Sequence, residues 1–329
     1  MMKNRVTSKI LSLILMVVMT VCVAVPGLAQ AAVKGKPVIG ITWEGNYTDA
    51  DYAAHAKLIE MAGGIPVFLK QVTSQAVDYD TKGAVLTKDL DPSGQLKQAY
   101  ANAIKSRKYN KTNVKEVMKG VDGVFFTGGE DISPTLFAHP EPVANKGEEI
   151  NATRDISDYT LMAYCHDKNI PALAVCRGMQ MMAIVNGAKF MQDIPTYYES
   201  KGKVYHYTHR MQRQVNRDYT PHDVDLTTKN SHLYEIVGAP SLKGVSSWHH
   251  QAVESIKGTK LLQTAKTVAD GVEIIEGIEC PDRTFYVGVQ FHPENDGKKA
   301  YVQGKSTTCN PEICLNFFKT FVKYAAKAK

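Results

Sequence analysis

The chain has 329 residues, of which 44% are hydrophobic and 22% charged, and its formal net charge is +6. This near-average composition excludes collagen-like, coiled-coil and disordered classes and suits one large domain or two small ones. The basic residues form no dense run with interleaved aromatic residues, so we expect no nucleic-acid partner.

The first residues have the pattern of a secretory signal peptide. A basic stretch at 3–9 precedes an apolar stretch at 10–24, and Ala29-Gln-Ala31 offers a cleavage site with small residues. We therefore predict a signal peptide over 1–31 and a single mature domain over 32–329. The alternative is an uncleaved N-terminal anchor, but the apolar stretch is short for a membrane span. We expect export to a periplasm or to the extracellular medium, with no stable membrane anchor after cleavage.

The cysteine count bears on redox chemistry. Of six cysteines, Cys22 would leave with the signal peptide, so an odd number remains and at least one thiol is free or pairs between molecules. If Cys176 is the free thiol, the others could form up to two disulfides outside the cytosol. Their pairing stays open, although Cys309 and Cys314 are close in sequence. The others are Cys165 and Cys280. A zinc site at 309–314 is disfavoured because no second ligand pair lies nearby.

The N-terminal third begins with a β-α-β pattern. An apolar strand at 36–42, a helix at 52–62 and a second strand at 65–69 predict a parallel sheet with a right-handed crossover. The segment at about 71–119 is polar and reads as an insertion. We expect a charged surface segment with helical pieces at 94–106 and 113–118, and a substrate lid is the alternative.

The rest of the chain alternates helices and strands. A helix at 155–167 has acidic residues in its first turn and an apolar face, and Asp270-Gly271 indicates a hairpin turn. A segment at 206–221, rich in His, Arg and Tyr, is expected to line or border a cleft. The predicted strands are 121–127, 171–175, 189–194 with a turn at Pro195, 221–226, 245–249, 261–269, 272–278 and 284–291, and the last helix is 311–326.

The candidate nucleophile lies between the strand at 171–175 and the helix that follows it. Cys176 occupies this sharp turn, Gly178 allows the backbone to pass tightly, and Gly187 ends the helix. A helix N-terminus favours a thiolate, and the arrangement is that of a nucleophile elbow. The alternative is an inert buried cysteine.

A cysteine nucleophile needs a base and a group that orients the base. His292 follows a buried strand, and Glu294 lies two residues later, after Pro293. The amides of the Gly128-Gly129 pair and of Arg177 could form an oxyanion hole. In a strand, His249 and His250 would point to opposite faces, so at most one would face the pocket.

Four motifs together resemble one family. They are VFFTGGEDISP at 124–134, AVCRGMQ at 174–180, WHHQAV at 248–253 and VGVQFHPE at 287–294. They are similar to those of the class I glutamine amidotransferase-like hydrolases, in the branch of the γ-glutamyl-γ-aminobutyrate hydrolases (peptidase family C26). The resemblance implies an α/β fold of flavodoxin-like type, with a mostly parallel sheet flanked by helices and additional antiparallel strands in the C-terminal half.

The resemblance also implies roles for matching residues. Cys176 would be the nucleophile, His292 the base and later the acid, and Glu294 the orienting group, with oxyanion amides from Gly129 and Arg177. The residues expected to bind substrate are Gly128, Gln180, His250 and Gln251. The reaction implied uses no metal and no organic cofactor, and a homodimer is a candidate assembly.

The expected function is hydrolysis of a γ-glutamyl amide through a γ-glutamyl thioester, releasing glutamate. The signal peptide and the insertion at 71–119 depart from the family pattern and leave the leaving amine open. Alternatives are a glutaminase component of an amidotransferase, a hydrolase of folate poly-γ-glutamate or of cell-wall γ-glutamyl peptides, and a secreted binding protein without catalysis.

Overall fold

The computed structural model describes residues 35–42, 49–144, 150–211 and 219–328. The predicted signal peptide at 1–31 lies outside these residues, so signal cleavage and export remain predictions. Within the described ranges, every helix is too short or too polar to serve as a bilayer-spanning segment.

The described residues form one sheet of eleven strands. Along its main path the order is β2-β1-β3-β4-β11-β10-β9-β6-β7, and β5 and β8 pair beside it, with β8 also joined to β10. The strands are β1 Val38–Ile41, β2 Ile65–Phe68, β3 Gly123–Phe126, β4 Ala172–Val175, β5 Lys189–Met191, β6 Thr220–Leu226, β7 Ser241–Ser247, β8 Ala252–Ser255, β9 Leu262–Ala269, β10 Val272–Glu279 and β11 Tyr286–Val289.

The first five strands of this order are mutually parallel, and the rest are antiparallel. The expected parallel strands at the centre of the fold, with additional antiparallel strands in the C-terminal half, are therefore confirmed. The predicted hairpin joins β9 to β10, because Asp270 and Gly271 both have positive φ angles, 51° and 77°.

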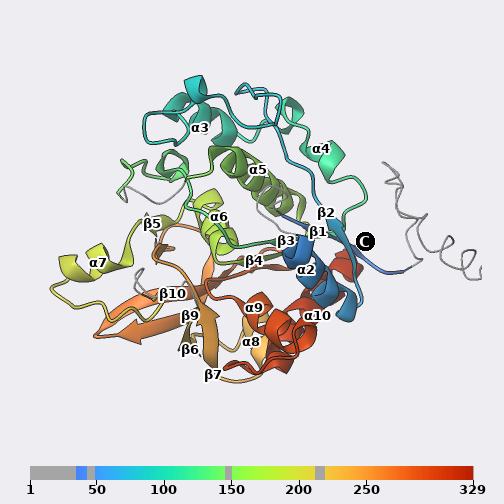
Figure 1. Cartoon of the computed structure of the whole chain (residues 1–329), viewed down its shortest axis with the longest axis vertical. Coiled ribbons are helices and arrows are strands. Elements are labelled where there is room, and N and C mark those ends of the chain that lie inside the picture. The colour runs from blue at the N-terminus through green and yellow to red at the C-terminus, as the bar shows by residue number, and fades with distance from the viewer. Residues whose placement is uncertain (1–34, 43–48, 145–149, 212–218, 329) are drawn as a thin grey trace, which may run out of the picture. The chain divides into compact units, whose positions relative to one another are not determined.

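Helices cover both faces of the parallel strands (Figure 1). The α-helices are α2 Asp49–Met61, α3 Gln98–Lys105, α4 Val114–Val117, α5 Ala152–Lys168, α6 Arg177–Val185, α7 Ile194–Ser200, α8 His232–Val237, α9 Pro293–Gly297 and α10 Pro311–Ala328. Short 3₁₀ turns are η2 Thr87–Asp89, η3 Tyr109–Lys111 and η4 Pro134–Leu136, and η5 Lys298–Val302 is a π-helical turn.

Alternate strand residues separate into two apolar cores, one on each face. On β4, Ala172 and Ala174 pack in the core that α5 and α6 cover. Leu173 and Val175 pack on the opposite side, with residues of α2 and α10. A strand buried on both faces reads as a continuous apolar run, which is why 171–175 was predictable without any alternation.

The segment at 71–119 carries exposed charged residues, as its polar composition predicts, but it is also anchored in the core. Several of its apolar side chains, among them Val72, Leu96 and Val114, are fully buried. It also binds α5 directly, since the Val72 amide donates to Ser157 Oγ at 3.0 Å. The apolar residues of this segment are sparse and aperiodic, so the sequence pattern conceals their burial.

Helices α7 and α8 are among the elements that the sequence analysis did not predict. The segment from Ile194 forms α7 rather than a strand end and turn, and Asp193 caps it by accepting a hydrogen bond from the Thr196 amide at 2.9 Å. Likewise, Ser231 caps α8 and Gly238 ends it in the left-handed conformation. Each start has a capping residue that sequence reasoning could have used.

Candidate active site

Cys176 lies on the predicted elbow between β4 and α6. Its backbone has φ 50° and ψ −112°, a conformation rare for a residue with a side chain. The Cys176 amide donates to Val289 O at 2.9 Å, which ties the elbow to β11. A Cβ atom on Gly178 would lie 2.7 Å from Phe126 O, so glycine is required where α6 passes β3. The Cys176 sulfur lies 3.8 Å from Trp248 O.

His292 and Glu294 form the pair that the spacing predicted. His292 follows β11, the parallel neighbour of β4, and its Nδ1 lies 2.5 Å from Glu294 Oε1. The His292 amide donates to Ser246 O at 2.8 Å, which fixes its backbone. Burial alone lowers the pKa of His292, but Glu294, with contributions from Tyr219 and Cys176, outweighs burial and raises it well above 6.5. These neighbouring groups therefore favour the imidazolium form of the ring.

The nucleophile and the base converge on the loop that follows β3. A Cβ atom on Gly128 would lie 2.8 Å from His292 Cε1 and 3.5 Å from Cys176 Cβ. The proximity of Cys176 also contributes to the raised pKa of His292. The structure thus brings together the three predicted catalytic residues and the glycine pair, while their catalytic roles remain predictions.

The two predicted oxyanion amides belong to Gly129, on the loop after β3, and to Arg177, which follows Cys176. Arg177 is the first residue of α6, so its N–H has no partner within the helix. Gly129 has φ +151°, and a Cβ atom there would lie 1.9 Å from Arg154 Nη1. Only glycine fits at 129, because both the backbone conformation and the space exclude a side chain.

Arg154, in the first turn of α5, holds the glycine loop in place. Its Nη2 donates to Gly128 O at 2.7 Å and to Thr127 Oγ1 at 3.1 Å. Its Nη1 donates to Glu130 Oε2 at 2.9 Å, and its Nε donates to Asp158 Oδ2 at 3.1 Å. One fully buried guanidinium therefore fixes the Gly128 carbonyl and the Glu130 carboxylate, the groups on either side of Gly129, which orients the Gly129 amide.

The same network of buried charges includes Arg177, the residue that follows Cys176 on the nucleophile elbow. The Arg177 side chain is fully buried and donates to Asp155 Oδ1 at 2.6 Å and to Asp158 Oδ2. The other oxygen of Asp155 accepts from the Ser133 amide at 2.9 Å. Burial raises the pKa of Asp155 to about 6 although Arg177 lies beside it. These carboxylates bind side chains and loops, whereas the sequence suggested only a favourable interaction with the helix dipole.

Sequence reasoning missed Arg154, Asp155 and Asp158 as supports of the site. The signal that could have found them is the 3.6-residue period of α5. Asp155 and Asp158 lie three residues apart in a helix that is otherwise largely buried, and buried carboxylates need cationic partners. The identity of those partners depends on tertiary contacts.

We expect Arg154→Met to lower the free energy of unfolding by about 3–5 kcal/mol, because it leaves buried carboxylates without their cation. Urea unfolding followed by tryptophan fluorescence measures this loss. Arg107→Met is the matched control: Arg107 pairs with Asp167, both side chains are about 30% exposed, and such pairs contribute at most about 1 kcal/mol. Equal losses in the two variants would contradict the role of Arg154.

The predicted substrate-binding side chains are engaged with the protein. Gln180 Nε2 donates to Gln251 O at 3.2 Å, and Gln251 Nε2 donates to Asp131 Oδ2 at 2.9 Å. His250 Nε2 lies 3.1 Å from Asp131 Oδ1, and its Nδ1 lies 3.4 Å from Asp193 Oδ1. Burial lowers the pKa of His250, but these two carboxylates outweigh burial and raise it to about 9. These residues brace the end of the glycine loop, and substrate contact remains a prediction.

The neighbouring histidines do diverge, but not as members of a strand. Strand β7 ends at Ser247, and both His249 and His250 lie in the turn after it. His249 points toward Glu276, 3.8 Å from its Oε1. In the segment 206–221, residues 212–218 lie outside the described ones, and His209 is fully buried beside the same carboxylate.

Among the described residues all five cysteines are free thiols. Cys309 and Cys314 are buried with their sulfur atoms 3.5 Å apart, the proximity expected from their spacing. Cys176 is set apart from them by its place at the elbow, beside a base.

The chain is similar in sequence to a known protein family and to several of its relatives. A family model described as peptidase C26 matches residues 96–294, more than half of the chain. The protein NtpR of Enterococcus hirae is 35% identical over 175 residues, which are 53% of this chain and 67% of that one. A putative glutamine amidotransferase of Mycobacterium tuberculosis is 27% identical over 272 residues, covering 79% and 70% of the two chains.

A more distant relative is γ-glutamyl-γ-aminobutyrate hydrolase PuuD of Escherichia coli. It is 23% identical over 185 residues, covering 55% of this chain and 67% of that one. The motifs, the elbow and these similarities agree: the chain belongs to the peptidase C26 family of glutamine amidotransferase-like, amide-cleaving enzymes.

Proposed function

We propose that this protein hydrolyses the γ-glutamyl amide bond of a small γ-glutamyl compound through a γ-glutamyl thioester. The observation that carries the proposal is Cys176, placed at the N-terminus of α6 beside the imidazole of His292, which Glu294 orients. The similarity to a protein named γ-glutamyl-γ-aminobutyrate hydrolase supports the substrate class.

In the proposed reaction the Cys176 thiolate attacks the γ-carbonyl carbon of the substrate. The carbonyl electrons move to oxygen, and the oxyanion accepts hydrogen bonds from the amides of Gly129 and Arg177, each of which contributes about 3 kcal/mol to the transition state. The His292 imidazolium gives its proton to the leaving amine as the C–N bond breaks. The resulting neutral imidazole then takes a proton from water as the water oxygen attacks the thioester carbonyl, and the C–S bond breaks, which releases glutamate and restores the Cys176 thiolate beside the imidazolium.

Glutamate release by the purified protein tests the proposal. The panel consists of γ-glutamyl-γ-aminobutyrate, γ-glutamyl dipeptides, poly-γ-glutamyl folate and free glutamine. We expect release from at least one γ-glutamyl amide other than glutamine. Release from glutamine alone would instead support a glutaminase component, the activity suggested by the name of the mycobacterial relative.

A silent site is the remaining alternative. If no compound in the panel releases glutamate and iodoacetamide labels Cys176 slowly, the protein is better described as a binding protein. Fast labelling without release would contradict the substrate class and leave the nucleophile in place.

We also propose that the protein is exported after cleavage near Ala31, on the strength of the N-terminal pattern alone. N-terminal sequencing of the protein isolated from its native cells tests this. A mature chain that begins near Ala32 is expected, and an intact N-terminus would contradict cleavage.

A further inference from the structure

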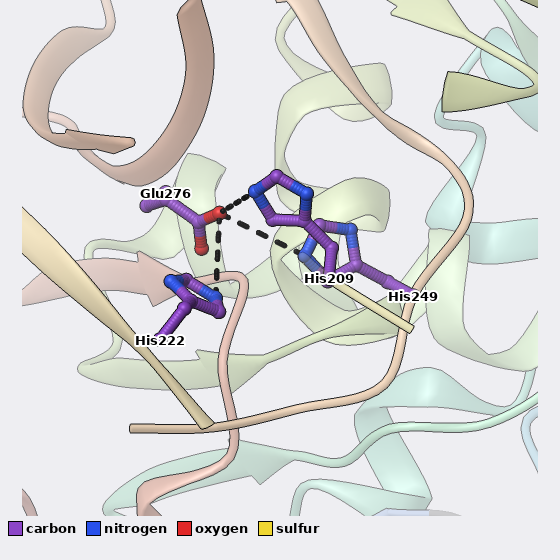
Figure 2. Close-up of side chains that lie close together, drawn as sticks. All are labelled: His209, His222, His249 and Glu276. Carbon is purple, nitrogen blue, oxygen red and sulfur yellow. Dashed lines mark ion pairs between the residues drawn. The ribbon is translucent and has the colours of Figure 1, made fainter. Parts of the chain in front are cut away.

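A buried cluster of three histidines and one glutamate lies outside the proposed catalytic residues. Figure 2 shows the imidazoles of His209, His222 and His249 and the carboxylate of Glu276 pointing toward one another. Their side chains are at most 4% exposed. Glu276 Oε1 lies 3.1 Å from Nε2 of His209 and 3.8 Å from Nε2 of both His222 and His249.

None of the facing atoms in this cluster has a hydrogen-bond partner among the described residues. This holds for Nε2 of His209, His222 and His249 and for both oxygens of Glu276, because even the 3.1 Å approach lacks hydrogen-bond geometry. Buried polar atoms without partners are costly, so a cluster of five at one point requires a ligand or a charge that satisfies them together.

The far side of two of the three rings shows which nitrogen is available. His249 Nδ1 lies 2.9 Å from Gln251 O, and His222 Nδ1 lies 3.1 Å from Asp223 O. A carbonyl oxygen only accepts, so Nδ1 carries the proton in both rings and Nε2 presents a lone pair to the cluster in the neutral form. Lone pairs of imidazole and carboxylate then face one another, which is the outer hydrogen-bonding arrangement of metal-binding histidines.

We propose that His209, His222, His249 and Glu276 bind one divalent first-row transition metal ion, with Zn²⁺ as the best-fitting ion. The four donor atoms lie within 4.8 Å of one another. Around a four-coordinate zinc ion with ligand distances of about 2.0–2.2 Å, donors are about 3.3–3.6 Å apart, so small side-chain movements suffice. The set of imidazole nitrogens and one carboxylate suits such ions and is poor for Ca²⁺ or Mg²⁺, which prefer oxygen.

The proposed metal site is of the structural and not of the catalytic kind. Four protein ligands fill a tetrahedral shell and leave no position for a reacting water. The ligands come from four separate places: the segment before β6, β6 itself, the turn after β7, and β10. The ion would therefore join segments that are distant in sequence.

One of these segments continues directly into the active site, and another is hydrogen-bonded to the segment that carries His292. Trp248, whose carbonyl oxygen lies 3.8 Å from the Cys176 sulfur, immediately precedes His249. On the other side, the Gln290 amide donates to Glu276 O at 2.9 Å, two residues before His292. Metal binding would thus stabilise the backbone on both sides of the proposed nucleophile and base. This role differs from the expectation that the protein uses no metal, which concerned the reaction itself.

Cobalt binding to the metal-free full chain tests the proposal, since four-coordinate Co²⁺ absorbs visible light intensely. Thiols that could also bind the ion are removed in a Cys176→Ala, Cys314→Ser background, because Asp296, Cys309 and Cys314 form a second group of close donor atoms. We expect one equivalent of Co²⁺ to bind, Zn²⁺ to displace it, and Zn²⁺ to raise the melting temperature.

Single substitutions in that background locate the ion. His222→Ala and Glu276→Gln should each weaken Co²⁺ binding by about 100-fold or more, since removing a ligand exceeds the loss seen for outer-shell partners. His232→Ala is the matched control, because His232 pairs with Glu279 on the same strand as Glu276 but outside the cluster, with Nδ1 3.0 Å from Oε2. Its binding should be unchanged.

Two results would overturn the proposal. One is a folded background protein, checked by circular dichroism, that binds neither Co²⁺ nor Zn²⁺ and melts at the same temperature with and without them. Protonation of the cluster, and not a metal ion, would then satisfy its facing atoms. The other is binding that persists unchanged in both ligand variants. Neither result depends on hydrolase activity, and the first does not depend on whether the ligand variants fold.

Discussion

Cys176→Ala should lower the turnover of the preferred γ-glutamyl substrate by about 10⁵-fold or more, because loss of the nucleophile in a triad of this kind removes nearly all catalysis. The Cys176 side chain is 5% exposed and lies on a turn fixed by the Val289 carbonyl, so its truncation removes one sulfur atom without disturbing the core. Initial rates of glutamate release, with equal melting temperatures for the two proteins, measure the effect.

The matched control is Cys165→Ala. Cys165 is fully buried in α5, and burial raises the pKa of its thiol, so it is an inert cysteine of the kind that was the alternative reading for Cys176. Its substitution should leave turnover within a few-fold of the parent. Retention of activity by Cys176→Ala would refute thioester formation at this residue, whatever Cys165→Ala does.

Glu294→Gln should lower kcat by about 10²–10⁴-fold and shift the alkaline limb of the kcat/KM profile to lower pH. The direction of this shift follows from the opposing influences on the pKa of His292. Burial lowers the pKa of the ring, and Glu294 is the largest of the influences that raise it. The active pair needs the imidazolium, so activity falls as pH rises through the pKa of His292. Without the carboxylate, that fall begins at lower pH.

Asp296→Asn is the control for the second prediction. Asp296 lies on the same helix, α9, but accepts from the Ser246 amide at 3.1 Å and from Ser246 Oγ at 2.9 Å instead of facing His292. This variant should be less stable and should keep the alkaline limb close to its parental position. An unmoved limb in Glu294→Gln would show that another group sets the protonation of His292.

The catalytic candidates were predictable because short motifs fix them locally. A strand, a cysteine, a glycine and a helix in immediate succession define an elbow, and a proline between His292 and Glu294 limits how the two side chains lie. The motifs do not identify the residues that hold the site in place. Arg154 binds Gly128 and Glu130 through tertiary hydrogen bonds, and no spacing rule links these positions in the sequence.

The parallel strands were predictable for a similar reason. Each is a continuous apolar run, a pattern that burial on both faces produces. The segment at 71–119 is the opposite case, since it buries scattered apolar residues under a polar composition and owes its conformation to hydrogen bonds with α5, such as that of the Val85 amide with Thr153 Oγ1 at 2.9 Å. The histidine cluster was equally hidden, because His209, His222 and His249 come from three different segments.

The adjacency of β4 and β11 has a consequence for the making of the protein. A ribosome completes the elbow at Cys176 when the antiparallel half of the sheet is still unmade, and β11 must then insert between β4 and β10. Pairings between segments so far apart in sequence are costly to close and form late. A nascent or prematurely terminated chain therefore has a thiol without its imidazole, and the proposed catalysis can begin only after β11 and His292 have been made.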